Sequence, residues 1–440
     1  MTPTIIAVVS IIVWAIFASN KMSRNAHAVN LAKAKTPTNT VGHAKHATGE
    51  TLTDKVGGLR LAYHKTTGKI LRLISKDGQH GIIYGTTGCG KSARWMICAM
   101  LDLAGRVSMV YVDPKGNTTA VVGKTLAEKG KLIVCNPYEN QEGLFPMTVP
   151  PNTPYNPLAR LSPDKYGFTV ECERIAGTFP DQGLSANETS AYFRNQATDL
   201  IAGVIMHVCD TYPPSYRHLT TVRNVITSSN GENFWQFVKD VKENGTPYDQ
   251  QKLSRFAETD DEGQMIAKSS KEAADVLATA ALYTRWFGNE DLGPSLEEDG
   301  FQYTSLKEIP TAVALICPLQ YLHTGGGKWL KLHVTSAIHE LWRNGRGEVP
   351  VIFFLDESDQ YADPIIHAAL NTARGFGISI IIIVQQASDI DFRYKNQAGA
   401  FLNGTTWKLV FNSDDQRTRE IVEKLSGTKA IMAPTVSLAV

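Results

Sequence analysis

The octet GTTGCGKS at residues 85–92 constrains the fold of this chain more than any other stretch. It follows the apolar run GIIYG and opens a stretch of helical character at 91–103. Its glycines let the backbone turn tightly between a strand and a helix, so that successive N–H groups point at an anion. The pattern therefore predicts a strand–loop–helix unit that cradles phosphate groups. The alternative is a glycine-rich turn in which the lysine occurs by chance.

The residues of the octet have expected places around a nucleotide. Lys91 is expected to reach the β and γ phosphates, and Ser92 to offer its hydroxyl to Mg²⁺. ATP and Mg²⁺ are therefore the predicted cofactors. A shorter lookalike, TGGGKW at 324–329, lacks the spacing and the final Ser or Thr, and we expect a loop there. The residues expected to bind the nucleotide are Gly85, Thr86, Thr87, Gly88, Cys89, Gly90, Lys91 and Ser92.

A second candidate element is the run VIFFLDES, whose apolar residues lead into Asp356 and Glu357. At the end of a buried strand, Asp356 can hold the metal ion through water, and Glu357 can polarise the attacking water. Two adjacent carboxylates repel each other unless a cation lies close, which is a physical reason to expect Mg²⁺ there. The alternative is an ordinary strand that ends in an acidic turn.

Two further candidates flank the apolar run ISIIIIVQQ. Gln385, at its end, is a neutral amide that can orient a water or sense the γ phosphate; the alternative is a plain polar strand end. Arg374 precedes Gly375 in NTARGFGI, where a cation and a glycine typically end a helix. The other interpretation of Arg374 is a catalytic arginine that reaches the nucleotide of a neighbouring subunit.

Short apolar runs rich in Val and Ile recur along the chain and are typical of strands buried on both faces. Helical stretches separate several of them, which predicts an α/β fold with a mainly parallel sheet. Between Leu158 and about Pro310 the strand runs stop and helical periodicity replaces them. The runs are GIIYG, SMVYVD, KLIVCNP, AVALICP, VIFFLDE and ISIIIIVQQ.

The chain of 440 residues is long enough for two folded units with appendages, and 43% hydrophobic with 20% charged residues is a globular composition. Six dispersed cysteines without a C-x-x-C pair argue for reduced core residues and against a structural zinc. We expect a membrane anchor at 1–20, a basic linker at 21–50, the first part of a nucleotide-binding domain at 51–180, an all-α insertion at 181–300 and the second part of the nucleotide-binding domain at 301–440.

The first residues predict an attachment to a membrane. Ile5 to Ala18 form a nearly unbroken apolar run, at the short end for a spanning helix, and the basic residues all follow it. A cleaved signal peptide usually has a cation before its apolar region, and here there is none. The positive-inside rule then predicts a single-pass protein whose main domain is cytoplasmic. Residues 1–110 hold fourteen Lys and Arg against four Asp and Glu, which suits an anionic surface.

The motifs GTTGCGKS, VDPKG, YNPL, FFLDE and ARGFGISIIIIVQQ occur in the order seen in the type IV secretion coupling proteins, which this chain resembles over about residues 40–440. The resemblance implies a RecA-like P-loop ATPase domain with an inserted all-α domain, anchored in the bacterial inner membrane and assembling as a homo-hexameric ring. Such proteins hand DNA–relaxase complexes or effector proteins to the channel components of a type IV secretion or conjugation system. Lys91, Ser92, Asp356, Glu357 and Gln385 match the family's nucleotide site, and Arg374 its proposed arginine finger.

The sequence departs from the family in three places. Cys89 stands where the family usually has Ser, and only one apolar span is visible where two are usual. The sequence stops at MAPTVSLAV, before the C-terminal stretch that the family leads us to expect, as in a fragment or in a short member. Two alternatives remain open at this stage. One is a DNA translocase of the FtsK/HerA type, and the other is a docking receptor that binds nucleotide with little turnover.

Overall fold

The computed structural model describes most of the chain from residue 59 onward, and the predicted anchor at 1–20 and linker at 21–50 lie outside the described residues. None of the described helices combines the length and the hydropathy that crossing a bilayer requires. The described residues are 59–63, 70–73, 79–139, 149–180, 188–227, 232–259, 265–267, 271–361, 363–395 and 398–426.

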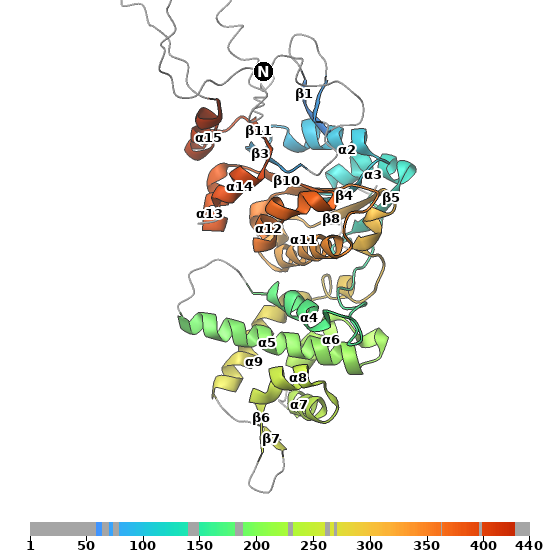
Figure 1. The fold of residues 1–440 in the computed structure, drawn as a ribbon, viewed down its shortest axis with the longest axis vertical. Helices are drawn as coiled ribbons and strands as arrows, with labels where there is room; N and C mark the ends of the chain where they lie inside the picture. The colour runs from blue at the N-terminus through green and yellow to red at the C-terminus, as the bar shows by residue number, and fades with distance from the viewer. Residues whose placement is uncertain are drawn as a thin grey trace, which may run out of the picture.

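A seven-stranded parallel sheet forms the centre of the upper body in Figure 1, in the order β11-β3-β10-β9-β4-β8-β5. The mixed α/β fold with a parallel sheet that the apolar runs predict is therefore confirmed. Non-consecutive neighbours require crossover connections, and helices supply them on both faces of the sheet. The strands are β3 (Gly81–Gly85), β4 (Ser108–Asp113), β5 (Lys131–Cys135), β8 (Thr311–Ile316), β9 (Val351–Asp356), β10 (Ile378–Val384) and β11 (Trp407–Phe411).

Helices cover both faces of the sheet because its strands are apolar on both faces. Along β10, Ile381 and Ile383 belong to the core under η1 and α2, whereas Ile380 and Ile382 belong to the larger core on the opposite face. Figure 1 shows α2 and α3 above the sheet and α11 and α12 below it. These elements are η1 (Lys91–Met96), α2 (Ile97–Leu103), α3 (Asn117–Lys129), α11 (Gly325–Arg343) and α12 (Pro364–Thr372).

Strand order brings three strand ends together at one edge of the sheet. β10 lies between β3 and β9, with Val384 opposite Tyr84 and Ile383 opposite Asp356. Since parallel strands all end at the same edge, Gln385 follows β10 directly beside the start of the glycine-rich loop and the acidic end of β9. This edge therefore holds residues that are hundreds of positions apart in the chain.

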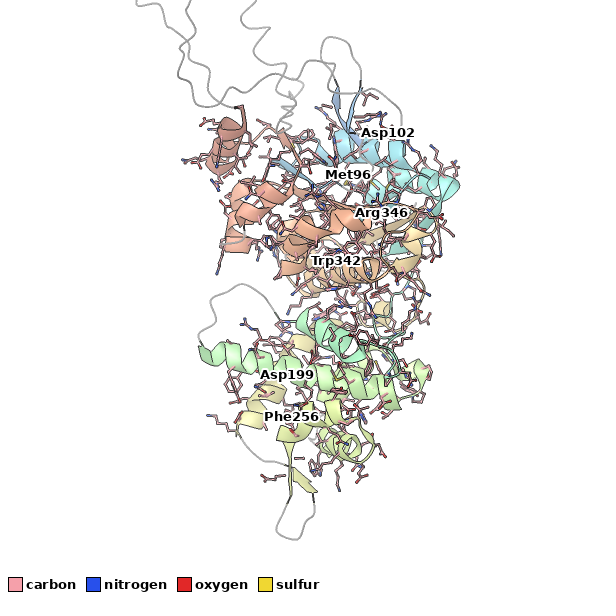
Figure 2. All side chains as sticks on the ribbon, in the orientation of Figure 1. Met96, Asp102, Asp199, Phe256, Trp342 and Arg346 are labelled. Carbon is pink, nitrogen blue, oxygen red and sulfur yellow. The ribbon has the colours of Figure 1, made fainter. Side chains whose placement is uncertain are left out.

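An antiparallel hairpin of β1 (Leu59–Tyr63) and β2 (Ile70–Leu73) precedes the sheet. Arg60 and Arg72 each donate to the Asp102 carboxylate on α2 at 2.8 Å, which fixes the hairpin to the helix that follows the loop. Figure 2 labels Asp102 on α2, below the hairpin. These arginines lower the pKa of Asp102 against the opposing effect of burial. The hairpin is thus joined to the helix of the candidate site by charge-assisted hydrogen bonds.

Between β5 and β8 the chain forms the helical body at the bottom of Figure 1. Its central helix, α5 (Glu188–Thr211), packs against α4, α6, α8 and α9. Lys252 on α8 pairs with Asp199 on α5 at 2.6 Å and with Glu173 on α4 at 2.8 Å. A short antiparallel pair, β6 (Ala257–Thr259) with β7 (Met265–Ala267), interrupts the helices. The other helices are α4 (Phe168–Gly177), α6 (Leu219–Thr227), α7 (Glu232–Asn244), α8 (Pro247–Leu253) and α9 (Lys271–Thr284).

The loop expected at 324–329 is wrong, because α11 begins at Gly325. A Cβ atom at Gly326 would lie 2.4 Å from Cys317 Sγ, and one at Gly327 would lie 2.2 Å from the Leu322 carbonyl oxygen. Close packing therefore explains the glycines of TGGGKW without a phosphate. The chain after β8 and β10 also forms α10 (Leu319–Leu322), α13 (Ala387–Tyr394), α14 (Ala398–Gly404) and α15 (Gln416–Ser426).

Candidate nucleotide-binding site

The loop between β3 and η1 has the backbone conformation that its glycines permit. Gly88 and Gly90 have φ values of 79° and 98°, in the left-handed region that other residues rarely adopt. Thr86, Thr87 and Gly88 are exposed, whereas Cys89 is buried with its sulfur turned toward Gly85. A Cβ atom at Gly88 would meet no atom of the described residues within 4 Å, so the loop presents its backbone to open space.

Lys91 lies inside this loop. Its side chain is 7% exposed, and its ammonium group donates a hydrogen bond to the carbonyl oxygen of Gly85, at the other end of the octet. The helix after the loop starts with a wide π-helical turn, Lys91–Met96, and has Gly90 as its N-cap without a side-chain cap. The first N–H groups of this helix therefore have no side-chain cap, and the Lys91 ammonium group lies within the same loop.

Ser92 and Asp356, 264 positions apart, meet at the same edge. The Ser92 hydroxyl donates to Asp356 Oδ2 at 3.2 Å, and Asp356 Oδ1 accepts from the Glu357 backbone N–H at 3.1 Å. Burial and, after it, the neighbouring Glu357 carboxylate raise the pKa of Asp356 to about 6, against the lowering effects of Lys91 and Ser92. A buried carboxylate beside a second one and a hydroxyl is a donor set that a hard divalent cation suits.

Glu357 and Gln385 also lie together. The Gln385 side-chain amide donates to Glu357 Oε2 at 3.4 Å, while its backbone carbonyl accepts from the Gly85 N–H at 3.0 Å. Gln385 thus touches both the start of the loop and the second carboxylate. Glu357 has φ of 51°, a conformation that costs a non-glycine residue roughly 1–3 kcal/mol. Such strain is typical of functional positions that the surrounding structure holds in place.

Arg374 does not join this cluster. It is exposed in η8 (Ala373–Phe376), before β10, and its carbonyl oxygen accepts from the N–H of Gly377, which has φ of 73°. Its backbone therefore takes part in the helix end that the sequence pattern predicts. The seven residues of β10 separate it from Gln385, which puts it about 20 Å away at the opposite edge of the sheet.

Two buried residues that follow the end of β9 were not predicted from the sequence. The buried Tyr361 hydroxyl donates to the Asp356 carbonyl oxygen at 2.8 Å and so fixes the strand end. Asp359 is also buried, and burial, followed by the charges of Glu357 and Asp389, raises its pKa to about 6. The sequence signal that could have indicated Tyr361 and Asp359 was their position in DESDQY, directly after the two carboxylates. By contrast, Asp113 of VDPKG accepts from the Thr119 N–H at 2.7 Å and holds the start of α3.

These residues fit a nucleotide with Mg²⁺. The loop borders open space at Gly88, where phosphate groups have room, and the Lys91 ammonium group inside the loop is a cation that suits phosphate oxygens. The Ser92 hydroxyl and the Asp356 carboxylate offer oxygen atoms, a donor type that suits Mg²⁺, because this ion also keeps several waters and phosphate oxygens in its shell. The parallel sheet, the loop and the carboxylates at neighbouring strand ends define the class of P-loop nucleoside triphosphatases.

Within that class, the chain belongs to the family described as type IV secretory system conjugative DNA transfer, whose model matches residues 27–438. The resemblance to the type IV secretion coupling proteins that the motifs predict is therefore confirmed. No curated protein sequence matches the chain.

Solved structures with the same fold include the plasmid coupling protein TrwB in complex with ADP and Mg²⁺, which is 15% identical. That match has a TM-score of 0.55 and covers 79% of this chain and 74% of the TrwB chain. TrwB in complex with a non-hydrolysable ATP analogue is 16% identical, with a TM-score of 0.54 and coverage of 80% and 78%. An unbound form of the bacterial conjugative coupling protein TrwB is 15% identical, with a TM-score of 0.55 and coverage of 80% and 76%.

Proposed function

We propose that this protein is a membrane-anchored ATPase that couples a DNA–relaxase complex or an effector protein to a type IV secretion or conjugation channel. The observation that carries the proposal is the meeting of Ser92 with Asp356, and of Glu357 with Gln385, at the loop edge of the sheet. Membership of the conjugative DNA transfer family supports the cargo, and the ADP and Mg²⁺ bound to the similar TrwB support the cofactors.

In the proposed reaction, the loop binds the triphosphate and Lys91 exchanges the Gly85 carbonyl oxygen for phosphate oxygens. Bound Mg²⁺, held by Ser92 and Asp356, would neutralise phosphate charge. Glu357 takes the proton of the attacking water, whose oxygen forms a bond to the γ phosphorus as the bond to the β–γ bridging oxygen breaks. The products are ADP and inorganic phosphate.

Gln385 is proposed to couple the binding of the γ phosphate to the activation of Glu357. Its amide donates to Glu357 in the structure, and its carbonyl oxygen binds the loop at Gly85. The bond from this amide to the Glu357 carboxylate is long, at 3.4 Å, and a γ phosphate in the loop would offer a second charged acceptor that competes for the amide. If the amide then donated its hydrogen bond to the phosphate, the Glu357 carboxylate would be free to bind the water. Gln385 would then report the presence of the γ phosphate to the catalytic base.

The assembly and location are proposed from the family resemblance. A homo-hexamer would bring Arg374 of one subunit to the nucleotide of the next, since within one chain Arg374 lies at the opposite edge of the sheet. An anchor at 1–20 would hold the ATPase domain at the cytoplasmic face of the inner membrane, beside the channel components. The basic linker at 21–50 would favour anionic lipid headgroups.

The decisive test uses the full chain in detergent and the variants Lys91→Ala and Glu357→Gln. We expect wild type to hydrolyse ATP, Lys91→Ala to lose binding, and Glu357→Gln to bind ATP without hydrolysing it. Both variants should abolish substrate transfer in cells. Transfer that persists in both variants would contradict a motor and favour the docking receptor.

A second measurement examines DNA as the cargo. Binding of DNA of unrelated sequences should weaken steeply between about 50 and 200 mM salt, because contacts to phosphates release counterions. Salt-insensitive binding would contradict a protein that tracks the DNA backbone. Transfer that requires a relaxase would distinguish a coupling protein from a translocase of the FtsK/HerA type, which acts on DNA alone.

A further inference from the structure

The position of the reacting groups fixes the direction in which a nucleotide must lie. The loop follows β3, and β3 has two neighbours in the sheet, β10 and β11. Gln385, Asp356 and Glu357 all lie on the β10 side. Since these groups serve the γ phosphate, the chain of phosphates runs from that side across the loop. The nucleoside then extends in the opposite direction, over the end of β11.

The end of β11 contacts the loop closely. Phe411, its last residue, is paired with Gly85, and a Cβ atom at Gly85 would lie 2.7 Å from the Phe411 carbonyl oxygen. The next residue, Asn412, accepts a hydrogen bond from the Thr86 hydroxyl through its backbone carbonyl at 3.5 Å. The segment after β11 therefore forms the wall of the loop on the side away from the reacting groups.

Most polar side chains after β11 already have partners. Ser413 accepts from the Asp415 N–H at 3.3 Å, and Asp414 pairs with Arg419 at 2.9 Å. Asp415 accepts from the N–H of Thr418 at 2.8 Å and so caps the start of α15. These groups hold the segment in shape and are not free for a ligand.

Asn412 differs from these neighbours. Its side chain is exposed, and it forms a hydrogen bond with none of the residues that the structure describes. Its φ of 29° is outside the regions that residues with a Cβ atom usually adopt, although Asn tolerates positive φ better than most. The hydrogen bond from Thr86 to its backbone carbonyl oxygen places Asn412 next to the loop, and its side chain is exposed there.

We propose that the Asn412 side chain binds the nucleoside end of the bound nucleotide. The amide offers both a donor and an acceptor, which suits the base edge or the ribose hydroxyls. This assignment rests on the proposed function, because it needs the triphosphate in the loop. It adds a determinant of nucleotide affinity from a strand outside the motifs that define the phosphate site.

The test compares binding of the whole nucleotide with binding of its phosphate chain alone. Binding of ATP and of inorganic tripolyphosphate, each with Mg²⁺, is measured by calorimetry on the full chain in detergent. The variant Asn412→Gly keeps a residue that accepts positive φ and removes the amide. The control Asn344→Gly makes the same change at an exposed residue that ends α11 before β9, at the other edge of the sheet. Circular dichroism and melting curves establish that both variants fold.

We expect Asn412→Gly to weaken ATP binding about tenfold, the size of one lost hydrogen bond to a well-placed partner. Its affinity for tripolyphosphate should stay within about twofold of wild type, and Asn344→Gly should bind both ligands as wild type does. Unchanged ATP affinity in Asn412→Gly would overturn the assignment. So would an equal loss for both ligands, which would show that Asn412 acts through the shape of the loop. A wild-type chain that binds neither ligand would refute the nucleotide site itself.

Discussion

Asp356 is expected to destabilise the nucleotide-free protein at neutral pH. It is 8% exposed, and burial together with the adjacent Glu357 raises its pKa from 3.8 to about 6. The folded state therefore disfavours the charged carboxylate that a bound cation would need. The change Asp356→Asn removes this charge and keeps the shape, since the Asn oxygen can still accept from the Glu357 N–H and its amide can donate to Ser92.

The size and sign of this effect follow from the pKa. A group whose pKa is higher in the folded than in the unfolded state contributes stability below its unfolded pKa, and this contribution is lost as the pH rises through its folded pKa. For Asp356 the difference is about two pH units, which corresponds to about 3 kcal/mol in the free energy of unfolding. We expect Asp356→Asn to unfold at a higher temperature than wild type at pH 7.5, and the difference to vanish near pH 4.

Melting curves of both proteins in detergent with EDTA, recorded at several values between pH 4 and pH 8, measure this difference. A second series with Mg²⁺ and ATP should reverse the order, because ligand binding stabilises wild type and Asn is a poor replacement for a charged ligand. The same change at a half-buried carboxylate of α5, away from the candidate site, is the control Asp210→Asn. Equal melting temperatures of wild type and Asp356→Asn at every pH would refute the reasoning.

Three further predictions concern other residues. Gln385→Ala should lower kcat at least about tenfold and leave ATP affinity nearly unchanged, because its amide acts through Glu357; equal losses in both would contradict this. Arg374→Ala should lose hydrolysis and regain part of it when mixed with Lys91→Ala subunits; no recovery in any mixture would favour a purely structural helix end. Burial, with the charge of Arg374, lowers the pKa of His80 to about 4, so stability present above about pH 6.5 should be lost as the pH falls toward 4. His80→Asn, which can still accept from the Ile380 N–H, should melt with less dependence on pH in this range.

The central sheet was largely predictable because burial on both faces leaves a strong signal. Strands such as β9 and β10 are continuous apolar runs. The abrupt change from apolar to polar residues at the end of each run marks the edge of the sheet. The same signal indicated Asp356, Glu357 and Gln385 as neighbours, and the structure places them together. Their roles in catalysis remain predictions.

The sequence analysis missed β11, and the reason is physical. Its run WKLVF holds Lys408 in the second position, which looks like a surface residue in a short apolar stretch. In the structure Lys408 is buried, its ammonium group donates to the Thr405 carbonyl oxygen at 2.9 Å, and burial lowers its pKa to about 8. From the pattern of apolar residues alone, a buried lysine whose ammonium group donates to a nearby carbonyl oxygen cannot be distinguished from a lysine in water. The wall of the loop at Asn412 was therefore also missed.

β10 connects the edge of the sheet that holds the phosphate loop with the opposite edge, which holds Arg374. Its C-terminal end leads into Gln385 at the loop, and its N-terminal end follows Arg374 about 20 Å away, farther than an arginine side chain extends. β10 pairs with β9 from Ile378 to Ile383 and with β3 from Ile381 to Val384, so it is joined to both of the strands that carry the phosphate loop and the carboxylates. A nucleotide that rearranges Gln385 and Glu357 would therefore act on the strand whose other end follows the exposed Arg374. The same geometry excludes Arg374 from the site of its own chain, so any catalytic role for this residue requires assembly.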